Sequence, residues 1–178
     1  EGWRDPLLRQ VTPPSLRKAY AKTGQYVKKA RFWLGYQGPH AAAYAKQLKT
    51  LHRAGVTLLA GSDTGNFGTF QGYSLHRELA LMVAAGVGKW AALRAGTTAA
   101  GRFVGRKLGV TAGDEASFVV LDASPLVDSA HTQRINEVIQ RGQLVDRAAL
   151  LKGMGVGVLT ATEAAKTGAK RRARRRAK

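Results

Sequence analysis

The sequence contains no cysteine, few acidic residues and no long apolar run. The absence of cysteine excludes disulfide bonds, thiolate metal sites and a cysteine nucleophile. No apolar run approaches the roughly 18 residues that a membrane-spanning helix needs, so we expect no transmembrane segment. The first residue is Glu1 rather than Met. The sequence therefore leaves open whether a natural start and a signal peptide precede it, and the cellular location is open too, with the cytoplasm slightly favoured.

The charge is strongly positive and is concentrated at the two ends of the chain. The 178 residues include 29 Lys and Arg against 11 Asp and Glu, a formal net charge of +18. Residues 1–50 have ten basic and two acidic residues, residues 166–178 have eight and none, and residues 51–165 have eleven and nine. The middle of the chain thus has the composition of an ordinary globular domain, with enough apolar residues to bury a core.

The two basic ends each allow two interpretations. The segment 166–178, KTGAKRRARRRAK, has no large apolar residue, so we predict a disordered tail. Such a tail could bind nucleic acid or another polyanion without reading sequence, or it could simply be solvated. Residues 16–36 interleave aromatic and basic side chains, which suits single-stranded nucleic acid but suits a packed amphipathic helix better.

A helix followed directly by a short apolar run indicates an α/β arrangement. Residues 41–54 have an apolar stripe at helical spacing and stop at Gly55. The run GVTLLAG at 55–61 is short and apolar throughout, as expected for a strand buried on both faces of a parallel sheet. Further helices are predicted after Ser74, which could cap the first of them, and at about 89–95 and 98–104.

The pattern changes to antiparallel strands after residue 115. Residues 116–121 and 135–145 are rich in β-branched residues, and Arg141-Gly142 has the character of a hairpin turn. A lone hairpin of this size is marginally stable, so partner strands are expected from elsewhere. Residues 150–160 show no regular period.

Asp63 and His76 are the candidate site residues. Asp63 follows the predicted strand 55–61 at its carboxyl end, where parallel α/β proteins place their chemistry, and it is the only acidic residue between Asp5 and Glu78. The same position would also suit a turn-forming or capping aspartate. His76 lies near the start of the following helix, where it could contact a substrate, although an exposed or capping histidine is the more common case.

Four segments in this order resemble the carboxyl-terminal part of the metal-dependent amidohydrolases, in particular the imidazolonepropionase-like and prolidase-like branch. They are LHRAGVTLLAGSDTG, SLHRELALMVAAGV, ALRAGTTAAGRFVGRKLGVTAGDEASFVVLDASPL and INEVIQRGQLVDR, between Leu51 and Arg147. The resemblance implies an α/β fold: the last part of a (β/α)8 TIM barrel, with GVTLLAG as strand eight, and the carboxyl-terminal strands of a small composite β-sandwich. It further implies domains at 1–108 (barrel segment) and 109–147 (sandwich strands), and composition predicts that 148–178 is a glycine-rich, basic and disordered tail.

The resemblance also implies a chemistry. In this family the aspartate that ends strand eight, here Asp63, is a metal ligand and takes a proton from water activated by one or two divalent metal ions, usually zinc. The hydroxide attacks an amide-like carbonyl and the carboxylate passes the proton to the leaving nitrogen. The implied activity is hydrolysis of carbon–nitrogen bonds other than ordinary peptide bonds in a small-molecule substrate, which His76 would contact.

The rest of the family's metal site has no counterpart in the sequence. The chain has four histidines, at 40, 52, 76 and 131, without HxH or HExxH spacing, whereas a catalytic zinc site usually has three protein ligands. A complete barrel takes about 250 residues. We therefore expect an incomplete barrel that is inactive alone, that needs a missing amino-terminal barrel portion as partner, and that tends to form oligomers. The alternative is a basic protein that binds nucleic acid or another polyanion through its tail.

Overall fold

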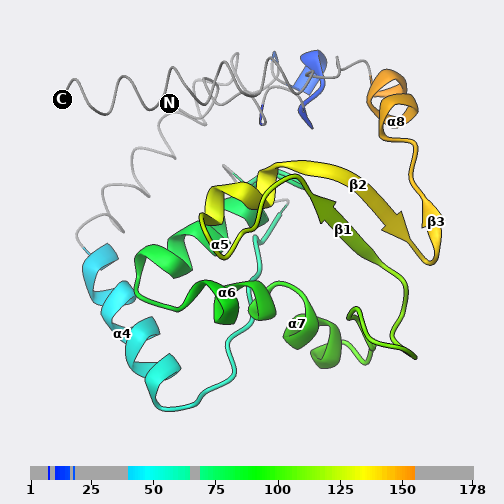
Figure 1. Cartoon of the computed structure of the whole chain (residues 1–178). Helices are drawn as coiled ribbons and strands as arrows, with labels where there is room; N and C mark the ends of the chain where they lie inside the picture. The colour runs from blue at the N-terminus through cyan, green and yellow to red at the C-terminus, as the bar shows by residue number, and fades with distance from the viewer. Residues whose placement is uncertain (1–7, 9–10, 17, 19–39, 65–68, 155–178) are drawn as a thin grey trace. The chain divides into compact units, whose positions relative to one another are not determined.

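The computed structural model of the chain describes residues 8, 11–16, 18, 40–64 and 69–154 (Figure 1). The chain divides into two compact units, one made of residues 1–22 and 146–178 and the other of residues 23–145. The described helices and strands of the larger unit are α4 (Ala41–Arg53), α5 (Ser74–Ala84), α6 (Lys89–Ala95), α7 (Thr98–Phe103), β1 (Phe118–Leu121), η3 (Ser129–Gln133), β2 (Ile135–Gln140) and β3 (Gln143–Leu144). None of the described helices is long and apolar enough to cross a membrane.

The core of the larger unit lies among its helices. Helix α5 packs against α4 and α6, and α6 packs against α7. The buried apolar side chains are Leu79 and Met82 of α5, Val87 of the α5–α6 turn, and Ala92 and Ala95 of α6. Leu79 and Met82 are three residues apart, as the predicted apolar stripe of this helix requires. The four helices expected from periodicity are therefore confirmed, with bounds within about two residues.

A three-stranded antiparallel sheet follows the helices, in the order β1-β2-β3. The predicted hairpin turn is confirmed. Arg141 and Gly142 both have positive φ, of 50° and 80°, which is the conformation of the two-residue turn that matches the natural twist of a β-hairpin. The pairing of β1 with β2 shifts in register between Val120 and Leu121.

The predicted strand at 55–61 is wrong in the described structure. No residue from 55 to 61 is in a strand, and Val56 and Leu59 are 47% and 40% exposed rather than buried on both faces. A backbone hydrogen bond from Ala60 N to Ala95 O, 2.9 Å long, joins the segment to α6. A parallel strand needs neighbouring strands on both sides, and the described residues place none beside this segment. The mixed helix and strand content is thus observed, but the barrel fragment itself is not.

The smaller unit contains α8 (Arg147–Gly153). The Asp146 side chain caps it by accepting a hydrogen bond of 2.9 Å from the Ala149 backbone N–H. Residues 148–153 therefore differ from the irregular, glycine-rich segment predicted there, because a capping aspartate precedes a short run of helix-forming residues. The basic tail at 166–178 and the predicted helix within 16–36 lie outside the described residues, except for Leu16 and Lys18.

Candidate functional site

Asp63 ends the extended segment that runs from α4 towards α5. Its side chain is exposed and its backbone has φ of 47°, in the left-handed region. Aspartate is one of the few residues apart from glycine that adopts this conformation readily. The hydroxyl of Thr69 donates a 2.9 Å hydrogen bond to the Asp63 carbonyl oxygen. An exposed side chain on a left-handed backbone suits both a turn-forming aspartate and an acid or base at the surface.

The first residue of α5 fixes the other end of this connection. The Phe70 backbone N–H donates to Ser74 Oγ at 2.7 Å, and the Ser74 N–H donates to the Phe70 carbonyl at 3.0 Å. Ser74 therefore does not cap α5, as the sequence suggested: the helix begins at Ser74, the capping position is Tyr73, and the hydroxyl holds the preceding loop instead. Together with the bond from Thr69 to Asp63, this reciprocal pair ties Asp63 to the start of α5.

His76 lies in the first turn of α5 and is half-buried. Within the described part of the chain, its Nδ1 atom is buried and has no hydrogen-bond partner. Burial lowers the pKa of the imidazole from its ordinary value of 6.5, because desolvation disfavours the charged form. The exposed histidine that the sequence favoured is thus not observed. A neutral imidazole of this kind can give or take one hydrogen bond at each nitrogen, depending on its tautomer.

Glu78 adds a second perturbed group to the same helix turn. Burial raises the pKa of its carboxyl above the ordinary 4.5. The sequence suggested only an acidic side chain near the amino terminus of the helix, favoured by the helix dipole, and did not predict its partial burial. The first turns of α5 therefore contain two titratable groups whose environments disfavour charge, which is common near functional sites but also in ordinary helix packing.

The described residues do not form a metal site. No group of three or more His, Asp or Glu side chains in the described segments is close enough to hold a metal ion. Asp63 would supply one ligand, and a catalytic zinc needs about three from the protein. A shallow hollow is lined by four residues of α4: Lys46, Gln47, Thr50 and Leu51. Neither Asp63 nor His76 lines it. Because one helix supplies all of its lining, it is a depression of the helix surface and not a candidate site.

Comparisons with known proteins give structural neighbours only. No family model matches the sequence, and no curated protein matches it. Among solved structures, the chain resembles a "putative prolidase" from Bifidobacterium longum, with a TM-score of 0.53 and 31% identity over 60% of this chain. It also resembles phenylurea hydrolase B, with a TM-score of 0.51 and 26% identity over 57% of this chain.

A third neighbour supports the fold alone. Molinate hydrolase matches with a TM-score of 0.51 and 23% identity over 64% of this chain. The chain spans less than a third of these structures: 28%, 26% and 29% of their lengths, in the same order. All three neighbours are amidohydrolase-superfamily proteins. The resemblance expected from the four sequence segments is confirmed, and over about 60% of its length this chain is similar to members of the amidohydrolase superfamily.

Proposed function

We propose that the chain is part of a hydrolase that cleaves carbon–nitrogen bonds in a small-molecule substrate, and that Asp63 is its proton-transfer residue. The observation that carries the proposal is the similarity, at 31% and 26% identity, to proteins named as a prolidase and a phenylurea hydrolase. A substrate with an amide-like bond, such as an amide of proline or a phenylurea, is the class that these names suggest.

The exposed carboxylate of Asp63 supports the proposed role. A carboxylate can accept a proton from a water molecule as that water attacks a carbonyl carbon. The water oxygen then bonds to the carbonyl carbon, the carbon–nitrogen bond breaks, and Asp63 returns the proton to the leaving nitrogen. The products are an amine and either a carboxylic acid, from an amide, or a carbamic acid, from a urea, and the carboxylate ends in its starting state.

The described residues do not fit a divalent metal without further ligands. Asp63 could hold such an ion only together with side chains from outside the described part of the chain. Because the chain spans less than a third of its structural neighbours, we propose that a further polypeptide portion completes both the site and the fold. Alone, the chain is expected to be inactive and to associate.

The test compares two charge-neutralised variants in the completed protein. The chain is joined to the polypeptide encoded directly upstream of Glu1 and assayed with a proline dipeptide, a phenylurea and molinate, with and without a chelator. Asp63→Asn is the appropriate variant, because Asn also tolerates the left-handed backbone at this position, whereas Ala would add strain. Glu137→Gln, at an exposed site on β2, is the matched control.

We expect Asp63→Asn to lower the rate by about a hundredfold or more, the usual contribution of a general acid–base residue, and Glu137→Gln to keep it. Full activity of Asp63→Asn would show that the role assigned to Asp63 is wrong. Hydrolysis by the chain alone at the rate of the joined protein would contradict the composite site.

The second candidate function is polyanion binding by residues 166–178, because eight of these thirteen residues are Lys or Arg. Binding to DNA of arbitrary sequence should weaken steeply with salt, since each neutralised phosphate releases a counterion. It should disappear when residues 166–178 are deleted or when their basic residues are replaced by Gln. Binding that survives both changes would contradict the assignment to the tail.

A further inference from the structure

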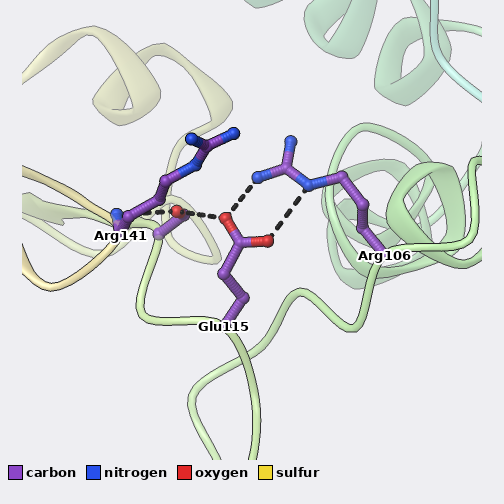
Figure 2. Close-up of polar contacts among 4 residues, drawn as sticks. Arg106, Glu115 and Arg141 are labelled. Carbon is purple, nitrogen blue, oxygen red and sulfur yellow. Dashed lines mark hydrogen bonds and ion pairs between the residues drawn. The ribbon is translucent and has the colours of Figure 1, made fainter.

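A chain of side-chain hydrogen bonds centred on Glu115 joins the segment after α7 to the turn between β2 and β3 (Figure 2). The Arg106 guanidinium donates twice to the Glu115 carboxylate, from Nε to Oε2 at 3.1 Å and from Nη2 to Oε1. Ser117 Oγ donates to Oε1 at 2.7 Å and accepts from the Arg141 backbone N–H at 3.0 Å. Because the serine hydroxyl donates and accepts at once, the bonds run without interruption from the guanidinium to the turn.

Two backbone hydrogen bonds run alongside this chain. The Gly142 N–H donates to the Ala116 carbonyl at 2.8 Å, and the Glu115 N–H donates to the Lys107 carbonyl at 2.8 Å. Both amides of the hairpin turn, those of Arg141 and Gly142, are therefore bound to residues 116 and 117. Residues 115–117 therefore contact both the segment after α7 and the hairpin turn.

Electrostatics favours the ionised form of the central carboxylate. The hydrogen bonds from Arg106, above all, and from Ser117 lower the pKa of Glu115, and the positive charge of Arg141 lowers it further. The interaction of Arg106 with Glu115 in turn raises the pKa of the guanidinium. The Arg106 and Glu115 side chains are 46% and 30% exposed. Single exposed ion pairs contribute little to stability, but two-point arginine pairs that belong to a network are the exception.

Among the described residues, the buried apolar core does not extend into the sheet. The buried apolar cluster described for the larger unit contains residues of α5, α6 and their connection, and none from β1, β2 or β3. Phe118, Val119 and Val120 of β1 are 39%, 50% and 39% exposed. At the opposite end of β1, η3 packs against α5, and the Asp122 N–H bonds to the Arg134 carbonyl at 2.9 Å. Near Phe118, the described contacts that join the turn to residues 116 and 117 are hydrogen bonds.

We propose that Glu115 is an electrostatic clamp that fixes the β2–β3 turn to the segment after α7, and that loss of its charge releases the turn while the helical core stays folded. The clamp is a conformational device of this fold and does not depend on the proposed hydrolase activity. Opening of the clamp would detach the turn from residues 116 and 117, next to strand β1, whose apolar side chains are already partly exposed. We expect the clamp to open at high salt or when the carboxylate is neutralised.

Amide hydrogen exchange of the full chain tests the clamp, because it reports local opening residue by residue. In Glu115→Gln we expect the amides of Arg141 and Gly142 to exchange faster by about fivefold or more, the factor that corresponds to the loss of about one hydrogen bond. The amides of Leu79 and Met82 in the core should keep their rates. Glu137→Gln, which neutralises an exposed carboxylate on β2, is the matched control and should leave the turn unchanged.

A second variant keeps the proposal testable if Glu115→Gln does not fold. Ser117→Ala removes the link between the carboxylate and the turn and should speed exchange at Arg141 more than at Gly142, whose bond to Ala116 remains. Added salt should speed exchange at the turn in the unmodified chain but have less effect in Ser117→Ala. Unchanged exchange at Arg141 in both variants would overturn the clamp, and so would an equal rise at Leu79 and Met82, since the turn would then not open separately.

Discussion

The side chain of Lys49 in α4 lies directly over Gly86, two residues after the end of α5. A Cβ atom at position 86 would be 3.1 Å from Lys49 Cδ and 3.3 Å from Cε. Gly86 also has φ of 93°, a backbone conformation that side chains disfavour. The last turn of α5 has no basic residue of its own. Lys49 therefore brings a positive charge to the end of α5, where the helix dipole favours it, and glycine makes room for its stem.

Replacing this glycine should destabilise the packing of α4 on α5. We expect Gly86→Ala to lower the free energy of unfolding by about 1–2 kcal/mol, because alanine in a left-handed conformation is strained and its methyl group would press on Lys49. Chemical denaturation would measure the change. Gly61→Ala is the control, since a Cβ there meets nothing within 4 Å; equal effects of the two substitutions would contradict the role of Lys49 and Gly86.

The two faces of α5 should respond differently to truncation. Met82 is 3% exposed and lies in the core, whereas its neighbour Leu81 is 53% exposed. We expect Met82→Ala to cost about 2–5 kcal/mol through the cavity it leaves, and Leu81→Ala less than about 0.5 kcal/mol. A large effect of Leu81→Ala in thermal unfolding would show that this face is covered in solution, for example by a second copy of the chain.

The helices and the hairpin could be predicted from the sequence because their signals are local. The stripe containing Leu79 and Met82 and the Arg141-Gly142 turn each depend on a few neighbouring residues. The segment 55–61 could not be assigned in the same way. An apolar run predicts a buried strand only if partner strands exist, and whether they do depends on polypeptide that is not among the described residues.

The sequence predicted where the candidate residues lie along the chain, but not their burial or their contacts. Asp63 was selected as a candidate because it follows an apolar run, and the structure adds its left-handed backbone and the bond from Thr69. The burial of His76 Nδ1 was not predictable, since helical periodicity places this residue beside the apolar stripe. The link between Arg106 and Glu115 spans nine residues of irregular chain, and no periodic pattern reports such a contact.

The burial of His76 predicts a pH dependence of stability near neutrality. Its pKa is lowered in the folded chain, so the unfolded chain takes up the proton first as the pH falls below about 6.5. The free energy of unfolding should therefore decrease from that pH downwards. Glu78, whose pKa is raised, acts in the opposite direction above about 4.5. The difference between the unmodified chain and His76→Gln isolates the histidine.

The expected result is a flatter curve of stability against pH for His76→Gln below about pH 6.5. Parallel curves for the unmodified chain and His76→Gln would mean that the imidazole is as well solvated in the folded state as in the unfolded chain.

Glu115 and Asp114 predict a second loss of stability in acid. Both have lowered pKa values, Glu115 through Arg106 and Asp114 through hydrogen bonds from Thr111. The unfolded chain takes up protons at these sites first, from about 4.5 and 3.8 downwards, so their contribution is present above those values and is lost below them. Circular dichroism at decreasing pH should show a shallower loss for Glu115→Gln than for the unmodified chain. A steeper loss of stability in the variant would contradict the lowered pKa of Glu115 in the folded chain.

The turn residue Arg141 should be replaceable with a gain in stability. Its φ of 50° is unfavourable for a long side chain, whereas Asn before Gly is the preferred pair for this turn. We expect Arg141→Asn to raise the free energy of unfolding by up to about 1 kcal/mol, measured by denaturation. Arg141→Gln removes the same charge but keeps the strained backbone and serves as the control. If both variants were equally stable, the gain in stability would come from the removed charge. If Arg141→Asn alone were more stable, the gain would come from the relieved backbone strain at this position, whose N–H donates to Ser117 Oγ.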